Sequence, residues 1–342
     1  MDKHQMLDLA VAQGIINAEQ RERMEAIAAS DLGDSEERLK PVGTFNEIFV
    51  TVGVALLTSA VAGLLALIIK DPVINPVVGA FVLIMVAEHF HSRKRFRLPL
   101  VYCALSAALA LGTATAIGLS GNDVDVFNKD TPLIASISPL VIGLLALIAA
   151  TWRYSIPFLM LPISVLFTII ITIAARATDD DMSFQVFLGA SGLAILAFAV
   201  RCDLLDPTRT KRWSDYAFWS YVVGSPLFVH SLFLSILLRG DEKLIMSGLT
   251  MLAVAVLTMA VSFAGLLLNR RALILSTLAY VAFVIYRILA GLTLSSSVTV
   301  LLVTLLAIGL YVTALGSRWR QVRNRVMDSL PPWKWLEKLP VR

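Results

Sequence analysis

The pattern of hydrophobic and polar positions divides the chain into a polar beginning, a long series of apolar stretches and a polar end. An α-helix rises 1.5 Å per residue, so about 20 apolar residues cross the roughly 30 Å of hydrocarbon in a bilayer. Ten stretches have this length and apolarity, which predicts an all-α, polytopic membrane helix bundle of about ten transmembrane helices. The predicted spans cover residues 47–69, 73–89, 98–119, 133–151, 156–175, 184–200, 215–238, 245–268, 271–290 and 298–316. The second and the sixth are short, with 17 residues each.

These spans divide the chain into three predicted parts. Residues 1–46 form an acidic, cytoplasmic helical hairpin, residues 47–316 form the transmembrane bundle, and residues 317–342 form a basic, Trp-containing tail at the membrane interface. Small residues in the bundle, such as those of "GASGLAILAFA" (189–199), predict close packing between helices.

Composition supports the membrane assignment. Apolar residues make up 57% of the chain and charged residues only 16%, whereas a soluble domain carries about 25% charged residues to solvate its surface. The surface that lacks charge must therefore face lipid. The pI of about 9.1 does not indicate nucleic-acid binding, because the basic residues lie in short loops between the spans.

The positions of Lys and Arg predict the orientation of the bundle. Alternate loops and the C-terminal tail together carry 18 of these residues, whereas the opposite loops carry five and are otherwise acidic. Basic loops stay in the cytoplasm, so both termini are predicted to be cytoplasmic. The first 46 residues contain no cleavable signal peptide, and the first span is expected to be an uncleaved anchor. The predicted localisation is the cytoplasmic (inner) membrane of a bacterium.

The N-terminal part is predicted to be two short helices, Gln5–Val11 and Asn17–Ala29, joined around Gly14. Asn17 and Gln20 have the spacing of a capping box, in which each side chain accepts a hydrogen bond from the other's backbone N–H. A shared apolar face is expected from Leu7, Val11, Ile15, Met24 and Ile27.

The segment "LDLAVAQGIINAEQRERMEAI" (7–27), followed by "NEIFVTVGVALLTSAVAGLLALI", resembles the opening of the DUF2157-type predicted membrane proteins of bacteria. In these proteins a short helical hairpin precedes a Gly-rich first span. The resemblance covers roughly the first 70 residues. It implies the hairpin and the first span, and it implies no activity, cofactor or site residue.

The most central ionisable residue in the bundle is His230, in "YVVGSPLFVHSLF". Ser225 and Pro226 precede it, and a proline inside a helix removes one backbone hydrogen bond, so the seventh span is predicted to be kinked or broken here. A titratable imidazole beside freed carbonyl groups favours a proton or substrate site. The alternative is a neutral histidine that is hydrogen-bonded to a neighbouring helix.

Three other residues complete the candidate intramembrane polar site. Arg287 and Tyr286 lie near the outer end of the ninth span, where Arg287 either binds an anionic group or reaches the interface. Glu88 lies at the end of the second span and is a proton-relay candidate if it faces the interior. Glu88 and His91 have metal-ligand spacing, but no second such pair exists, so we expect neither a metal nor another cofactor.

The C-terminal tail, "RWRQVRNRVMDSLPPWKWLEKLPVR", combines tryptophans with seven cations and is expected to bind anionic lipids of the cytoplasmic leaflet. No catalytic motif is present. Ten spans exceed what an anchor needs, which favours a secondary transporter or flippase of a small solute, proton or lipid. The alternatives are a membrane scaffold, sensor or regulator that binds a protein partner through the hairpin, and a membrane-embedded enzyme that acts on lipid.

Overall fold

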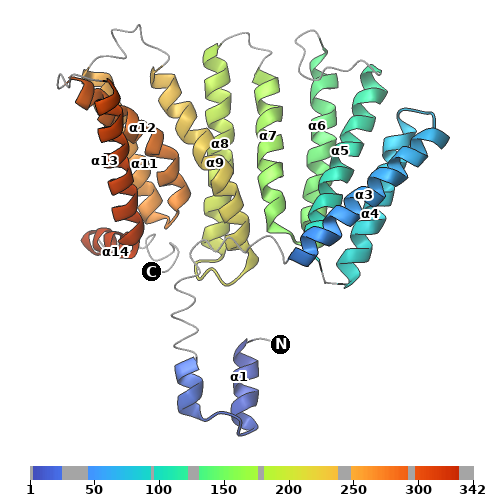
Figure 1. Cartoon of the computed structure of the whole chain (residues 1–342), viewed down its shortest axis with the longest axis horizontal. Helices are drawn as coiled ribbons and strands as arrows, with labels where there is room; N and C mark the ends of the chain where they lie inside the picture. Colours follow the sequence, from blue (N-terminus) through green and yellow to red (C-terminus); the bar gives the residue numbers. More distant parts are fainter. Residues whose placement is uncertain are drawn as a thin grey trace. The chain divides into compact units, whose positions relative to one another are not determined.

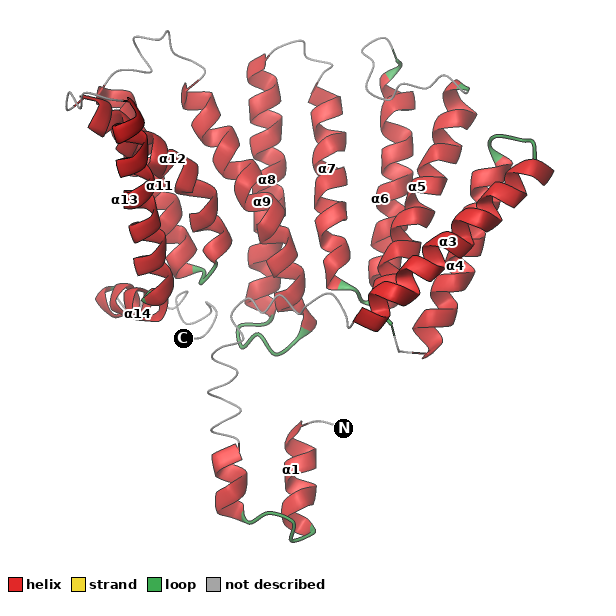
Figure 2. Ribbon diagram, viewed as in Figure 1, coloured by secondary structure: helices red, strands yellow, loops and turns green. Residues whose placement is uncertain are grey.

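The computed structural model describes residues 3–24, 45–93, 96–121, 131–175, 181–237, 248–291 and 297–330. Within these ranges the regular secondary structure is helical and contains no strand (Figure 2). The chain separates into two compact units, Met1–Val42 and Gly43–Val341. The prediction of an all-α, multi-pass membrane protein is confirmed.

The first unit contains the predicted hairpin. Helix α1 (Lys3–Ala12) ends before Gly14, whose φ of +70° suits a glycine, and a second helix begins at Ala18 and continues beyond the described residues. The capping box is confirmed, because Asn17 N donates to Gln20 Oε1 at 2.9 Å and Gln20 N donates to Asn17 Oδ1 at 2.7 Å. An ion pair of 3.0 Å between Arg21 and Asp8 joins the two helices.

The apolar face predicted for the hairpin forms only in part. Leu7 and Val11 are partly buried, whereas Ile15 is 69% exposed and Met24 is 49% exposed. Ile27 lies outside the described residues. Two short helices bury too little surface to enclose every apolar side chain, so some of these side chains stay at the surface.

The second unit contains ten helical segments that are long and apolar enough to cross a membrane, as the hydropathy pattern predicted. Their helices are α3 (Phe45–Ile68), α4 (Ile74–Arg93), α5 (Leu98–Ser120), α6 (Leu133–Tyr154), η1 (Pro157–Leu159) leading into α7 (Met160–Ala175), α8 (Asp181–Leu205), α9 (Arg212–Leu237), α11 (Gly248–Leu267), α12 (Arg271–Gly291) and α13 (Ser297–Ser317). A further amphipathic helix, α14 (Trp319–Ser329), follows α13.

The helices of this unit lie side by side largely in chain order, from α3 and α4 to α13 (Figure 1). We call the basic end the end at which α4 meets α5, α6 meets η1, α8 meets α9 and α11 meets α12. The turns there carry Arg97, Arg153, Arg209 and Arg270. At the opposite end, Asp71 caps α4 by accepting hydrogen bonds from Val73 N and Ile74 N, each at 2.9 Å. These donors, with Ile74 the stronger, lower the pKa of the Asp71 carboxyl below its ordinary value.

Two expectations about individual spans are wrong. The second and the sixth spans are not short, since α4 has 20 residues and α8 has 25. Both helices continue through charged residues because partners on other helices meet those charges: Arg153 pairs with Glu88 on α4, and Arg270 pairs with Asp203 on α8. The seventh span is not broken either, since α9 continues as one helix through Pro226.

Two separate apolar cores hold the bundle together. The first is formed by α4, α5, α6, η1 and α7, and it includes Ala87, Cys103 and Leu159. The second is formed by α8, α9, α11 and α12, and it includes Tyr221, Phe233 and Val254. Helices α7, α8 and α9 are in contact, so the two cores are adjacent parts of one unit.

Glycine residues allow α8 and α9 to pack closely, as the small residues of 189–199 predicted. A Cβ atom at Gly192 would lie 2.5 Å from Phe228 N and 2.9 Å from Phe228 Cα. A Cβ atom at Gly224 on α9 would lie 2.9 Å from Ile195 Cγ2. Backbone-to-backbone contact of this kind is how helices associate in lipid, where burial of apolar surface gives little driving force.

We expect Gly192→Ala to destabilise the protein by about 1–3 kcal/mol, because the new methyl group meets backbone atoms that cannot rotate away. Thermal unfolding of the purified protein in detergent measures the loss. Gly309→Ala on α13 is the control, since nothing lies within 4 Å of its Cβ position. Equal stability of the two variants would contradict the packing described here.

Candidate functional sites in the helix bundle

His230 is held by a residue that the sequence analysis did not single out. Its Nδ1 lies 2.6 Å from the hydroxyl of Tyr280 on α12, and Tyr280 stacks on Phe233 with ring centroids 3.7 Å apart. Tyr280 is 7% exposed and Phe233 is fully buried. The imidazole is therefore hydrogen-bonded to a neighbouring helix inside a packed aromatic group, which corresponds to the structural alternative weighed for this residue.

Ser225 and Pro226 lie on α9 one turn before His230, at the contact with α8. Ser225 is fully buried, and its hydroxyl oxygen has no hydrogen-bond partner among the described residues. The neighbouring Gly224 packs against Ile195 of α8. The small residues before Pro226 thus serve the close α8–α9 contact, and no interruption of the helix opens a site there.

Arg287 and Tyr286 lie two turns beyond Tyr280 on α12, which is about 10 Å along the helix axis. Arg287 is partly buried and Tyr286 is 36% exposed. Glu88 lies far from them in the fold, on α4, where it forms a 2.9 Å ion pair with Arg153 at the basic end. The six candidate residues therefore belong to separate places: the α8–α9–α12 contact, the far part of α12, and the α4–α6 contact.

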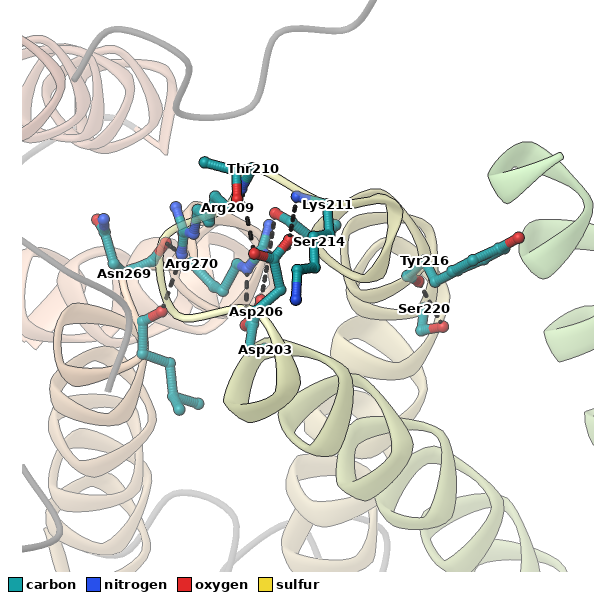
Figure 3. A network of polar contacts seen from close by, with 11 residues as sticks. Asp203, Asp206, Arg209, Thr210, Lys211, Ser214, Tyr216, Ser220, Asn269 and Arg270 are labelled. Atoms are coloured by element: carbon teal, nitrogen blue, oxygen red, sulfur yellow. Dashed lines mark hydrogen bonds and ion pairs between the residues drawn. The ribbon is translucent and has the colours of Figure 1, made fainter. Parts of the chain in front are cut away.

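The largest buried polar group in the described chain joins the ends of α8, α9 and α12 (Figure 3). Arg270 is 2% exposed and forms two hydrogen bonds with Asp203, which is fully buried; Nε donates to Oδ2 at 3.0 Å, and Nη2 donates to Oδ1. The guanidinium carbon also lies 5.1 Å from the centre of the Tyr221 ring. This arrangement combines a bidentate ion pair with a cation–π contact.

Asp206 organises the turn that follows. Its carboxylate accepts hydrogen bonds from Thr210 N at 3.1 Å and from Lys211 N at 2.8 Å. The Arg209 Nη2 atom reaches across to Asn269 O at 3.0 Å, and Trp319 Nε1 of α14 donates to Asn269 Oδ1 at 2.9 Å. The α8–α9 turn, the α11–α12 turn and α14 are thereby joined at the basic end.

The sequence analysis missed this network. Asp203 and Asp206 stand among Arg201, Arg209 and Lys211 in a loop that was interpreted only as an orientation signal. The available signal was the presence of two acidic residues in an otherwise basic loop. Their partner, Arg270, lies 67 residues further along the chain, and no spacing rule connects them.

A groove of about 710 Å³ lies between α6 and α7 on one side and α8 and α9 on the other. We call it the seam groove, because it lies where the two apolar cores meet. Its lining residues are Leu144, Ile148, Thr151, Trp152, Ser155, Met160, Ile163, Ser164, Phe167, Ala194, Ile195, Phe198, Arg212, Trp213 and Tyr216. The sequence analysis placed none of these residues in a ligand site, except that it left a lining role open for the aromatic run that begins at Tyr216.

The lining of the seam groove changes character along its length. Thr151 and Ser155 at the end of α6, together with Arg212 in the first turn of α9, place its charged and most of its polar groups at the basic end. Deeper in, the walls are apolar except for Ser164. A second groove of about 400 Å³, formed by α5, α6 and α7, has no charged lining residue.

A metal site finds no support in the described ranges, where no three His, Cys, Asp or Glu side chains group closely enough to hold an ion. The two cysteines, Cys103 and Cys202, are buried as free thiols in different cores. The chemistry on offer is therefore a polarised, largely apolar groove and a set of buried hydrogen bonds.

We expect Asp203→Ala to cost about 3–5 kcal/mol of stability, because it leaves the Arg270 charge buried without its carboxylate. Glu88→Ala is the matched control, since it breaks a half-exposed ion pair worth at most about 1 kcal/mol. Denaturation of the purified protein measures both. The double variant Asp203→Leu with Arg270→Met should recover part of the loss, and a loss for Asp203→Ala no larger than the control's would contradict a stabilising pair.

Comparison of the chain with protein-family models, curated protein sequences and solved structures gives no match. The resemblance of residues 7–27 and the first span to DUF2157-type proteins stays a prediction. The function is therefore inferred from the chemistry of the groove and of the residues around it.

Proposed function

We propose that the protein is a lipid transporter of the flippase type in the bacterial cytoplasmic membrane, with the basic end and both termini in the cytoplasm. The observation that carries the proposal is the seam groove, which is apolar along most of its length and polar at the basic end. A ligand that matches both parts is an amphiphile, with a chain for the apolar walls and a headgroup for the polar end. Its volume of about 710 Å³ falls within the roughly 300–1,000 Å³ typical of small-molecule sites.

The place of the groove favours transport over static binding. It lies between two separately packed cores, and each core keeps its own contacts if the two parts rock against each other. Rocking of two packed parts around a site at their junction is the usual way in which transporters change access. A small rotation would then alter the groove without breaking either core.

His230 is not among the residues that line the seam groove. Together with Tyr280 it lies within the second core region, in contact with Phe233. We assign the lipid contacts to the groove residues and none to His230, Ser225, Pro226, Tyr286, Arg287 or Glu88.

A further element of the proposal concerns α14. Trp319 and Arg323 are buried against the α11–α12 turn, and Arg323 Nε donates to Leu266 O at 3.2 Å. Arg318, Arg320 and Arg325 are exposed. We propose that these three cations contact anionic lipids of the cytoplasmic leaflet, which attracts basic amphipathic helices.

Reconstituted liposomes that contain a trace of headgroup-labelled fluorescent phospholipid test the transport function. An impermeant reductant added outside reports how fast labelled lipid reaches the outer leaflet. We expect the protein to accelerate this exchange, and Ala194→Trp to return it toward the rate of protein-free liposomes, because the indole fills the groove.

The control for this experiment is Leu193→Trp, which makes the same addition one residue away on the 54% exposed, lipid-facing side of α8. It should leave exchange unchanged. The transport proposal fails if the protein gives no acceleration over protein-free liposomes, or if both tryptophan variants behave alike.

The N-terminal hairpin supports a second candidate function, that of a scaffold or regulator that binds a protein partner. Leu9, Ile15 and Met24 are 47%, 69% and 49% exposed on an otherwise acidic, capped hairpin. Exposed apolar side chains rimmed by polar residues are typical of interaction surfaces. The interaction surface would be this apolar group, and the helix bundle would serve as its anchor.

Deletion of residues 1–40 tests the regulator function. We expect the truncated protein to insert and unfold like the full chain while losing any partner that crosslinks through the hairpin. Ile15→Ser in the full chain should weaken the same crosslink, whereas Ala18→Ser at an exposed polar face should not. Recovery of the same partners without the hairpin would refute this function.

A further inference from the structure

The seam groove carries information on the class of lipid, which deepens the proposed function and depends on it. Along α6 the lining extends from Leu144 to Ser155, which is about 16 Å at 1.5 Å per residue. This length is about half of the roughly 30 Å hydrocarbon thickness of a bilayer. The groove is therefore as deep as one leaflet, and the fitting occupant is a lipid of the leaflet at the basic end.

Aromatic side chains mark the depth of the lipid headgroups at the groove's polar end. Trp152 at the end of α6 is 86% exposed and Trp213 in the first turn of α9 is 43% exposed. Tyr216 lies beside Trp213, with ring centroids 5.9 Å apart. Tryptophan and tyrosine prefer the membrane–water interface, so the headgroup of a lipid in the groove would lie level with these rings.

Arg212 is the one charged residue among the lining residues of the groove. It is exposed, and its Nη1 donates a long hydrogen bond of 3.4 Å to Ser155 O across the groove. A guanidinium group has five N–H donors in a planar fork that matches a phosphate. Arg212 also begins α9, where the first N–H groups of the helix and its dipole favour an anion. Asp215 lies in the same turn but does not line the groove.

We propose that the seam groove binds a phospholipid, with an acyl chain along the apolar walls and the phosphate group on Arg212. The second groove offers a contrast within the same bundle, because its lining has no cation and gives a headgroup nothing to bind. Charge at one end and apolar walls at the other select a molecule that carries both a phosphate and a chain.

Native mass spectrometry of the full chain in detergent tests the proposal with three probes: dioctanoyl phosphatidic acid, dioctanoylglycerol and inorganic phosphate. The two lipids share their chains and differ only in the phosphate. We expect phosphatidic acid to bind about ten-fold or more tightly than dioctanoylglycerol, in line with a charge-assisted hydrogen bond.

Arg212→Gln should remove this preference while leaving dioctanoylglycerol binding unchanged, which also shows that the variant is folded. Lys211→Gln is the matched control, because the neighbouring lysine is exposed and does not line the groove. Ala194→Trp should weaken both lipids equally.

The outcomes separate this inference from the proposed function. Equal binding of the two lipids overturns the phosphate site and leaves the lipid groove standing. Displacement of phosphatidic acid by inorganic phosphate alone identifies a free-phosphate site and also overturns the inference. If neither lipid binds, or if Ala194→Trp changes nothing, the groove is not a lipid site and both proposals fail.

Discussion

Hydrocarbon offers no hydrogen-bond partner, so every polar group placed within the bilayer must find its partner inside the protein. The pair Asp203–Arg270 is the clearest consequence in this structure. Two opposite charges, each almost inaccessible, meet in a bidentate contact at the basic end, and Tyr221 covers the guanidinium group. Because the two residues come from α8 and from the start of α12, the pair also determines which helices of the second core lie together.

The remaining polar contacts of the second core follow the same constraint. Asp206 satisfies the backbone of the α8–α9 turn, and Arg209 and Trp319 satisfy the α11–α12 turn. His230 finds Tyr280 across α9 and α12. With these groups satisfied internally, the outer faces of the helices carry only apolar side chains, such as Leu252 and Leu302, toward lipid.

The first core lacks such a buried ion pair among the described residues; its charged contact, Glu88–Arg153, is half-exposed at the basic end. The two halves thus differ in how they are held. The first depends on apolar packing, and the second combines apolar packing with buried charge. A boundary between two differently stabilised cores is where the seam groove lies, and it is the place in the bundle at which movement costs least.

The chain by itself determined the elements of this fold. Runs of apolar residues long enough to cross a bilayer have no stable alternative to a helix, because no other segment satisfies its own backbone in lipid. The cap at Asn17 and Gln20 was equally readable, since its partners lie three residues apart. Local features of this kind depend only on neighbours in the sequence.

Only the tertiary structure decided how the helices meet. Gly224, Ser225 and Pro226 looked like a break, yet they serve the close approach of α8, because the outcome at a proline depends on what packs beside it. Arg270 counted as one more basic residue until Asp203 came to lie against it from 67 residues away. The seam groove likewise has walls from four helices, so its polarity gradient exists only after they pack. Hydropathy specifies which segments enter the membrane, whereas contacts between distant residues specify what they enclose.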